Sequence, residues 1–99
     1  MKLTFEWDER KGRENRKVHK VGFEEAKTVF NDPFLISFPD EVHSGHEERL
    51  LSIGTSIRDR VLLVVHTESY EENGVTMVRI ISARKATSSE RRVYEENQE

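Results

Sequence analysis

The sequence predicts an α+β domain with two N-terminal helices, an antiparallel sheet of about four strands and one C-terminal helix. Three observations predict this class. Apolar and polar residues alternate over several short segments, which is typical of half-buried strands. Two segments near the N-terminus instead favour helices, and a helix-capping pattern precedes the C-terminal segment. A length of 99 residues favours one compact domain that spans residues 1–99.

The N-terminal third of the chain predicts one strand and two helices. Residues 3–7 alternate apolar and polar side chains, as a strand does. Asp8 suits the N-cap of a very polar helix from residue 9 to about residue 19. The next helix, over residues 22–30, has apolar side chains at i, i+3 and i+7, and Pro33 lies just beyond its end.

The remaining two thirds predict the sheet and the last helix. Residues 34–38, 48–54, 60–68 and 75–83 have strand character. Asn73-Gly74 is a turn signal, so the last two of these segments should form a hairpin. Thr87-Ser88-Ser89-Glu90 matches the capping box and predicts a helix over residues 88–96.

Composition excludes several classes of protein. Cysteine is absent, which excludes a disulfide scaffold, a thiolate zinc site and a cysteine nucleophile. The longest apolar run, Val61-Leu62-Leu63-Val64-Val65, is far shorter than the roughly 20 residues that span a bilayer. The N-terminus has no apolar signal-peptide region. We therefore expect a cytoplasmic protein.

Positive charge gathers in the first predicted helix, although the whole chain carries a net charge of −3. Only Glu9 and Glu14 oppose the basic residues of this stretch, which are Arg10, Lys11, Arg13, Arg16, Lys17 and Lys20. A local basic surface can bind phosphates even on an acidic chain, because salt screens charge beyond about 8–10 Å. The alternative is an ordinary solvated helix face.

Arginines in or beside the predicted strands are the main candidates for chemistry. They are Arg49, Arg58, Arg60, Arg79 and Arg84. If helices cover one face of the sheet, these side chains could form a ring on the other face and grip a phosphate through their two-pronged donors. Alternatively, each pairs with a nearby acid such as Glu48, Asp59, Glu68 or Glu90. Arg79 and Arg84 share a face only if a bulge intervenes or Arg84 lies past the strand.

Two further side chains are candidates with two interpretations each. His19 ends the basic helix, where it could transfer a proton near neutral pH or simply complement the helix dipole. Tyr94 lies one helical turn after Glu90, and either presents its hydroxyl to a site or buries its ring.

The sequence gives little support for a metal or nucleotide site. His43, His46 and Glu47 have the spacing H-x-x-H-E, but a helical zinc site needs histidines at i and i+4, and Gly45 argues against a helix. There is no phosphate-binding glycine loop and no G-x-S-x-G motif. We therefore expect no bound metal and no cofactor.

The sequence resembles the BrnT family, the ribonuclease toxins of bacterial type II BrnT/BrnA toxin–antitoxin systems, which have a RelE-like fold. The matching strings are Phe5-Glu6-Trp7-Asp8, Lys11, Asn15, Phe23-Glu24-Glu25-Ala26, Val29-Phe30-Asn31-Asp32, Glu48-Arg49, Ile53-Gly54, Arg79-Ile80-Ile81-Ser82-Ala83-Arg84-Lys85-Ala86, Glu90-Arg91 and Tyr94. One departure affects the basic region: where the family usually reads Lys-His-Gly, this chain has Val18, His19 and Lys20, and Gly22 replaces a serine.

The resemblance implies a metal-independent endoribonuclease that inhibits translation and growth. The 2′-hydroxyl of RNA would attack its own phosphate. The implied catalytic residues are Arg60, Arg79 and Arg84 on the phosphate and His19 and Glu48 in proton transfer, and the implied substrate-binding residues are Arg49, Lys17, Lys20 and Tyr94.

The resemblance also implies protein partners. A ribbon-helix-helix antitoxin like BrnA would neutralise the toxin, as a dimer of toxin–antitoxin heterodimers, and operator DNA would be bound only through the antitoxin. If the antitoxin covers the RNA-binding surface, it should be acidic there. The alternatives are a non-catalytic RNA- or partner-binding subunit of such a repressor complex and an inactivated toxin.

Overall fold

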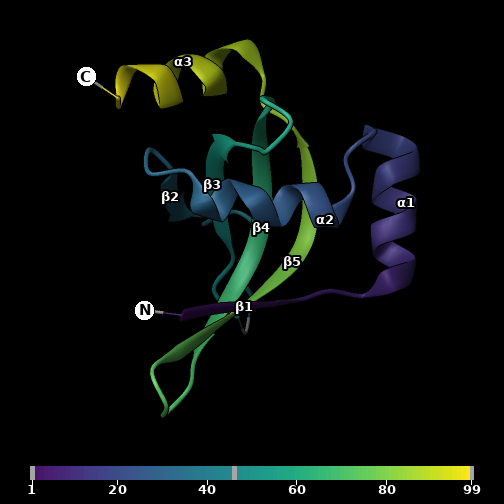
Figure 1. Cartoon of the computed structure of the whole chain (residues 1–99), viewed down its shortest axis with the longest axis vertical. Helices are drawn as coiled ribbons and strands as arrows, with labels where there is room; N and C mark the ends of the chain where they lie inside the picture. The colour runs from purple at the N-terminus through teal and green to yellow at the C-terminus, as the bar shows by residue number, and fades with distance from the viewer. Residues whose placement is uncertain (1, 46, 99) are drawn as a thin grey trace.

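A computed structural model describes residues 2–45 and 47–98. Five strands form one sheet in the order β1-β5-β4-β3-β2, with three α-helices and one 3₁₀ helix around it (Figure 1). In chain order the elements are β1 (Lys2–Glu6), α1 (Glu9–His19), α2 (Phe23–Ala26), η1 (Lys27–Asn31), β2 (Ile36–Pro39), β3 (Leu50–Thr55), β4 (Val61–Tyr70), β5 (Val75–Lys85) and α3 (Ser88–Glu96). The predicted α+β class is confirmed. No helix in the described part of the chain is long and apolar enough to cross a membrane.

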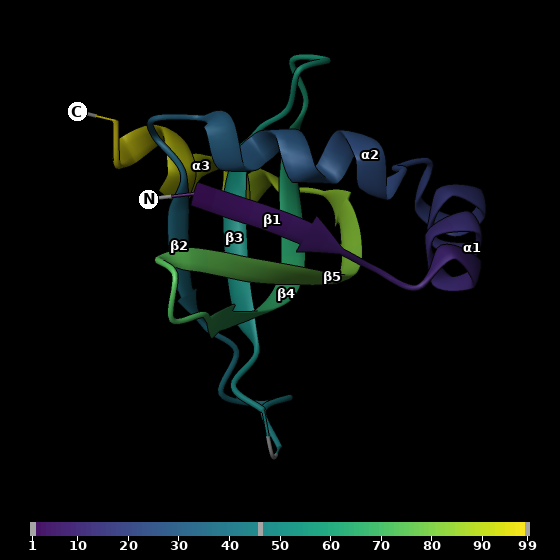
Figure 2. The ribbon, with the colours of Figure 1, turned by 60° about the horizontal axis from the view of Figure 1, so that its bottom comes forward.

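The sheet differs from the expected antiparallel sheet of about four strands, because it has five strands and is mixed. β1 pairs parallel to β5, with Phe5 opposite Val78, while every other pair is antiparallel. Figure 2 shows β1 and β5 side by side. Alternation identified β1 as a strand, but the direction of its pairing depends on a partner about 70 residues away in the sequence. The predicted second helix is also divided: α2 is four residues long and η1 continues it as a 3₁₀ helix.

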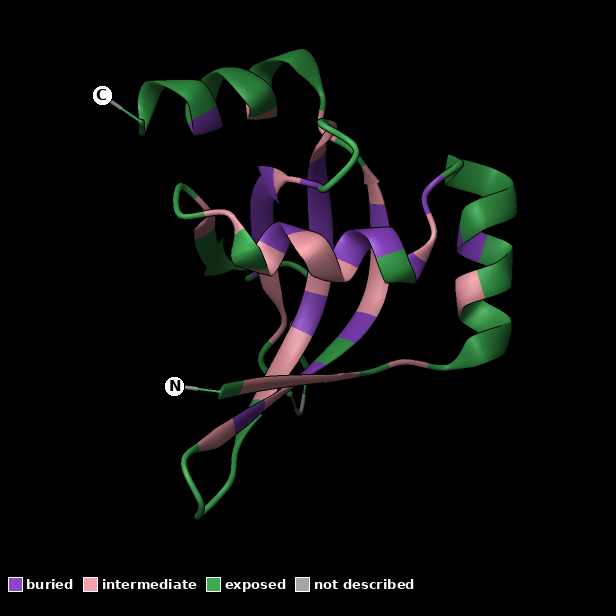
Figure 3. Ribbon diagram, viewed as in Figure 1, coloured by how far each residue is buried: buried purple, intermediate pink, exposed green. Residues whose placement is uncertain are grey.

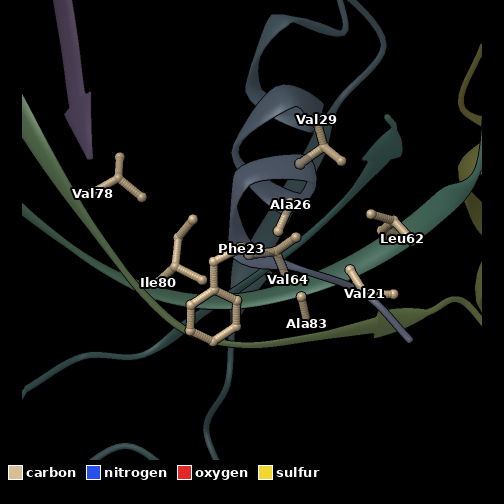
Figure 4. Packing of buried hydrophobic residues seen from close by; sticks show 9 residues of the cluster. All are labelled: Val21, Phe23, Ala26, Val29, Leu62, Val64, Val78, Ile80 and Ala83. Atoms are coloured by element: carbon tan, nitrogen blue, oxygen red, sulfur yellow. The ribbon is translucent and has the colours of Figure 1, made fainter. Parts of the chain in front are cut away.

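One face of the sheet is covered by α2 and η1, which supply the main core. Figure 4 shows Phe23, Ala26 and Val29 pointing from this helical segment onto strands β4 and β5. The complete buried cluster consists of Val21, Phe23, Ala26, Val29, Leu62, Val64, Val78, Ile80 and Ala83. Burying one of the larger apolar side chains of this cluster contributes roughly 1.5–3 kcal/mol to the free energy of folding. This layer therefore dominates the stability of the fold.

The opposite face of the sheet is covered only in part. Helix α3 packs Tyr94 against Ile53 and Leu63, which form a second, smaller buried cluster. Most of the surface of α3 stays exposed, as does most of α1 (Figure 3). The part of this face nearer to β1 is therefore open, and it holds the candidate site described below.

A β-bulge in β5 changes which side chains share this open face. Val65 of β4 pairs with Ser82, but the next residue, His66, pairs with Ile80, so Ile81 is an extra residue in β5. One extra residue reverses the alternation of the strand beyond it. The bulge that the sequence required for Arg79 and Arg84 to share a face is therefore present.

Helix α1 lies beside the second half of β5 and is fixed there by one buried amide. Asn15 Nδ2 donates hydrogen bonds of 2.8 Å to the carbonyl oxygens of Ala83 and Val21, and the Ala83 N–H donates to Asn15 Oδ1 over 3.2 Å. The amide therefore satisfies backbone groups of β5 just beyond the bulge. This contact sets how the basic helix stands relative to the sheet.

Candidate active site

The candidate site begins with one row of side chains across the open face of the sheet. Thr67 of β4 is opposite Arg79 of β5, and Arg79 is opposite Glu6 of β1. Leu50 is opposite His66, so Arg49, the residue before it, continues the row beside Thr67. The row therefore places two guanidinium groups on the same face, one on each side of Thr67.

These arginines line a surface depression that we call the cationic groove. Its lining consists of Lys11, His43, Gly45, Glu47, Arg49, Thr67, Arg79 and Ile81. Lys11 comes from the first turn of α1, Arg49 directly precedes β3, and Arg79 comes from β5. Two planar guanidinium groups and one ammonium group on a single concave surface provide the donors that a phosphodiester needs.

An adjoining depression shares Glu47, Thr67 and Arg79 with the cationic groove but is acidic. Its remaining lining residues are Glu6, Glu48, Glu68, Ser69 and Met77. Glu48, a predicted proton-transfer residue, therefore lies beside Arg79 in the same part of the molecule. The site has a cationic half that can hold phosphate and a carboxylate half that can accept protons.

Arg79 already has one partner, but the contact is weak. Arg79 Nη1 lies 3.3 Å from Glu6 Oε1, and the two side chains are 47% and 49% exposed. Exposed ion pairs of this kind contribute about 0–1 kcal/mol, because water and salt screen them. A phosphate can therefore replace the carboxylate of Glu6 at small cost.

His43 is a further titratable side chain in the cationic groove. Its Nδ1 lies 3.1 Å from Oδ2 of the buried Asp40, which orients the ring. A histidine held by a carboxylate through one nitrogen can transfer a proton through the other. Sequence reasoning considered His43 only as a metal ligand with His46, and His46 lies outside the described residues. Within residues 2–45 and 47–98, no three metal-ligating side chains come together.

Arg60 directly precedes β4, whereas Arg79 is opposite Thr67 further along that strand, and Arg60 has an internal partner. Arg60 Nε donates to Glu25 Oε2 over 2.9 Å, Nη2 donates to Oε1 of the same carboxylate, and Nη2 also donates to the Lys20 carbonyl over 3.1 Å. The Arg60 guanidinium lowers the pKa of Glu25, helped by a 2.7 Å hydrogen bond from Ser56. Arg58 is 3.9 Å from the same carboxylate. These contacts tie the β3–β4 turn to α2.

Arg84 shares the face of Arg79, but Glu90 neutralises it. Its Nη1 and Nη2 donate to the two carboxylate oxygens of Glu90 over 2.8 and 2.9 Å. Glu90 also accepts from the N–H of Thr87 in the predicted capping box, which is confirmed. The Arg84 guanidinium and the Thr87 N–H lower the pKa of Glu90 to about 2. This fork-to-fork pair holds the start of α3 on the sheet.

Tyr94 is buried rather than presented to solvent. Its hydroxyl donates to Asp32 Oδ2 and lies 2.9 Å from Thr55 Oγ1. Burial, with the neighbouring Asp32 carboxylate, raises the pKa of Tyr94. The side chain therefore fixes α3 to the turn after η1.

The remaining predicted residues lie at the C-terminal end of α1. His19, Lys17 and Lys20 are exposed, and Lys20 closes the helix in a left-handed conformation with φ of 61°. Because a helix rises about 1.5 Å per residue, His19 lies roughly 12 Å along the axis from Lys11 of the groove. The structure thus brings together Arg49, Arg79 and Glu48 and separates them from His19, Lys17, Lys20, Arg60, Arg84 and Tyr94.

The comparison with known protein families shows to which family the chain belongs. Residues 7–90 match the sequence profile described as "Ribonuclease toxin, BrnT, of type II toxin-antitoxin system". The chain belongs to the BrnT family. The family match covers all of α1, strands β2 to β5 and the capping box of α3. It therefore includes every residue of the cationic groove.

One solved structure supports the BrnT fold independently. The crystal structure of the Brucella abortus ribonuclease toxin BrnT aligns with 89% of this chain and 100% of its own, at 21% identity and a TM-score of 0.62. At this identity the likeness concerns the fold alone. No curated protein sequence matches the chain.

Sequence reasoning did not select Lys11 or His43 as candidates for this BrnT site. Lys11 was visible in the basic stretch and in the matching string after Asp8, but nothing local distinguished it from its basic neighbours. His43 lies in a polar loop whose position over the sheet no periodicity reveals. The register of β3, β4 and β5 is what brings them together with Arg49 and Arg79.

Proposed function

We propose that this BrnT-family protein cleaves single-stranded RNA at the cationic groove, without a metal ion. The observation that carries the proposal is the convergence of Lys11, Arg49 and Arg79 on one open depression. In such a site the positive charges stabilise the extra negative charge that develops on the phosphate in the transition state.

The proposed reaction is a transesterification within the RNA strand. A base removes the proton of a 2′-hydroxyl, whose oxygen bonds to the adjacent phosphorus. The bond from phosphorus to the 5′-oxygen breaks, and an acid protonates that oxygen. The products are a 2′,3′-cyclic phosphate and a 5′-hydroxyl.

The side chains of the groove divide these tasks. We assign Arg79 and Arg49 to the phosphate oxygens, with Lys11 as an additional charge. Glu48, in the acidic half, and His43, oriented by Asp40, are the proton-transfer candidates. One positioned acid or base contributes about 10²–10⁴-fold to the rate.

We assign the other predicted residues to different roles. Arg60, Arg84 and Tyr94 support the fold, because each has an internal partner. His19, Lys17 and Lys20 would contact RNA only where the strand extends beyond the groove.

The decisive experiment compares three substrates of one sequence in buffer with EDTA. Single-stranded RNA should be cut to products with 2′,3′-cyclic phosphate ends, while DNA and fully 2′-O-methylated RNA should stay intact because they lack the nucleophile. Cleavage that needs an added divalent cation, or cleavage of the methylated strand, would refute the proposed chemistry.

We also propose that a BrnA-like ribbon-helix-helix antitoxin neutralises the protein by covering the cationic groove. The acidic surface expected of such a partner fits the charge of Lys11, Arg49 and Arg79. Expression of the chain alone should stop growth by inhibiting translation, and Arg79→Ala should weaken the arrest. A harmless wild-type chain that still binds its antitoxin would favour the non-catalytic alternative.

A further inference from the structure

A second row of side chains lies next to the row that carries the groove arginines, and it is apolar. Phe38 of β2 is opposite Leu51 of β3, Leu51 is opposite Val65 of β4, and Val65 is opposite Ser82 of β5. We call this the apolar row. It occupies the positions two residues along each strand from Arg49 and Thr67, and therefore lies on the same open face.

The apolar row is accessible, unlike the row beyond it. Phe38 is 38% exposed, and Leu51 and Val65 are only half-buried. Tyr94 of α3 packs on the following row, where Ile53 and Leu63 are buried. The apolar row thus lies between the cover formed by α3 and the cationic groove.

We propose that the apolar row binds the base of the nucleotide whose phosphate lies in the cationic groove. This inference rests on the proposed function, because it needs RNA in that groove. The two rows are about 6.6–6.8 Å apart along the strands, and neighbouring strands lie about 4.8 Å apart. Phe38 and Arg49 are on neighbouring strands, so they can contact the base and the phosphate of one nucleotide, whereas Arg79, three strands from Phe38, would hold the adjacent phosphate.

The chemistry of the two rows favours RNA as the occupant over an apolar segment of a protein. A nucleotide joins an anion to a flat aromatic ring, and here a row with two guanidinium groups borders a row of aromatic and aliphatic side chains. The contact to the base is through its face, so it tolerates every base.

Phe38 is the anchor of this subsite, because it is the aromatic side chain of the row. Its ring is at the end of the row on the edge strand β2, where a base can stack on it. Stacking of one base on one aromatic side chain changes affinity by about 5- to 150-fold when the side chain becomes alanine. The expected effect of Phe38→Ala on RNA binding is in this range.

The test uses an uncleavable, fully 2′-O-methylated single-stranded oligonucleotide and a copy with abasic sites, with dissociation constants measured for the whole chain. Phe34→Ala is the matched control, because Phe34 is 48% exposed and lies in the turn before β2 rather than in the row. We expect Phe38→Ala to weaken binding of the complete oligonucleotide about 5- to 150-fold. Phe34→Ala should have no effect, and Phe38→Ala should have little effect on the abasic copy. Phe38→Trp should retain binding.

Three outcomes separate the possible failures. If the wild-type protein neither binds nor cleaves RNA, the proposed function and this inference both fail. If it binds and cleaves RNA but Phe38→Ala equals Phe34→Ala, or weakens the complete and abasic strands equally, only the inference is overturned. If Phe38→Ala leaves RNA binding intact and weakens antitoxin binding instead, the row is a protein-docking surface and the inference is overturned.

Discussion

Replacing Arg79 by alanine is the sharpest perturbation of the candidate site. The guanidinium would be lost from the middle of the groove, where it borders both the cationic and the acidic half. A hydrogen bond to a charged group is worth about 1.5–3 kcal/mol, and each 1.4 kcal/mol is a factor of ten. We therefore expect kcat/KM for RNA cleavage to fall roughly 10- to 150-fold. Arg49 and Lys11 remain, so some activity should persist.

The same substitution should leave the stability of the fold almost unchanged. The ion pair of Arg79 with Glu6 is about half exposed on both sides and so contributes less than about 1 kcal/mol. The matched control is Arg91→Ala, because Arg91 forms a 2.9 Å pair with Glu95 on α3, with side chains 60% and 58% exposed.

Initial rates of cleavage of a fluorescent oligoribonucleotide, with urea denaturation of each variant, provide the assay. Arg79→Lys should lie between wild type and Arg79→Ala, since lysine keeps the charge but loses the planar fork. A kcat/KM for Arg79→Ala within twofold of the Arg91→Ala control would refute the placement of the phosphate in this groove.

Three further predictions concern the supports of the site. Asn15→Ala should lower the free energy of unfolding by roughly 2–4 kcal/mol in urea denaturation, because it leaves buried backbone groups of Ala83 without partners; a loss below about 0.5 kcal/mol would contradict this. The pKa of Glu90 is about 2 in the folded state, below its ordinary 4.5, so the stability from its pair with Arg84 is present above pH 4.5 and is lost as the pH falls towards 2. Glu90→Gln should flatten that part of the stability–pH curve, and an unchanged slope would show that the pair contributes nothing. Gly54→Ala should destabilise by about 1–3 kcal/mol, because a Cβ there would meet a leucine methyl carbon at 2.8 Å; equal thermal midpoints would refute the clash.

Elements that depend on local signals were predictable from the sequence. The capping box at Thr87 and the turn at Asn73-Gly74 involve residues within a few positions, and both define elements of the structure. The parallel pairing of β1 was not predictable in this way. The alternation of apolar and polar residues in β1 indicates that one face is buried. It does not indicate the partner strand, which begins at Val75, far away in the sequence.

In the candidate site, too, local features were predictable from the sequence and contacts between distant residues were not. The residue types of the site were visible, because arginines on strands are unusual unless a wet face or a partner explains them. Glu90, the partner of Arg84, was among the acids considered, but Glu25 and Glu6, the partners of Arg60 and Arg79, were not. Arg60 meets Glu25 from a helix 35 residues earlier, whereas Arg79 meets only an exposed carboxylate of an edge strand. The direction in which Lys11 faces also depends on the contact of Asn15 with β5.

What distinguishes Arg79 from Arg84, the two arginines that β5 places on the open face, is how firmly each acidic partner is held. Glu90 is fixed by the backbone of its own helix cap as well as by Arg84, so a phosphate that displaced it would also leave the Thr87 N–H without its acceptor. Glu6 lies at the end of an edge strand with half of its side chain in solvent, and it loses little when Arg79 turns to another anion. A substrate phosphate can therefore exchange with the carboxylate at Arg79 but not with the one at Arg84. We therefore propose different roles for two arginines of the same strand and face, phosphate binding for Arg79 and holding α3 for Arg84, because of the neighbours that the fold supplies.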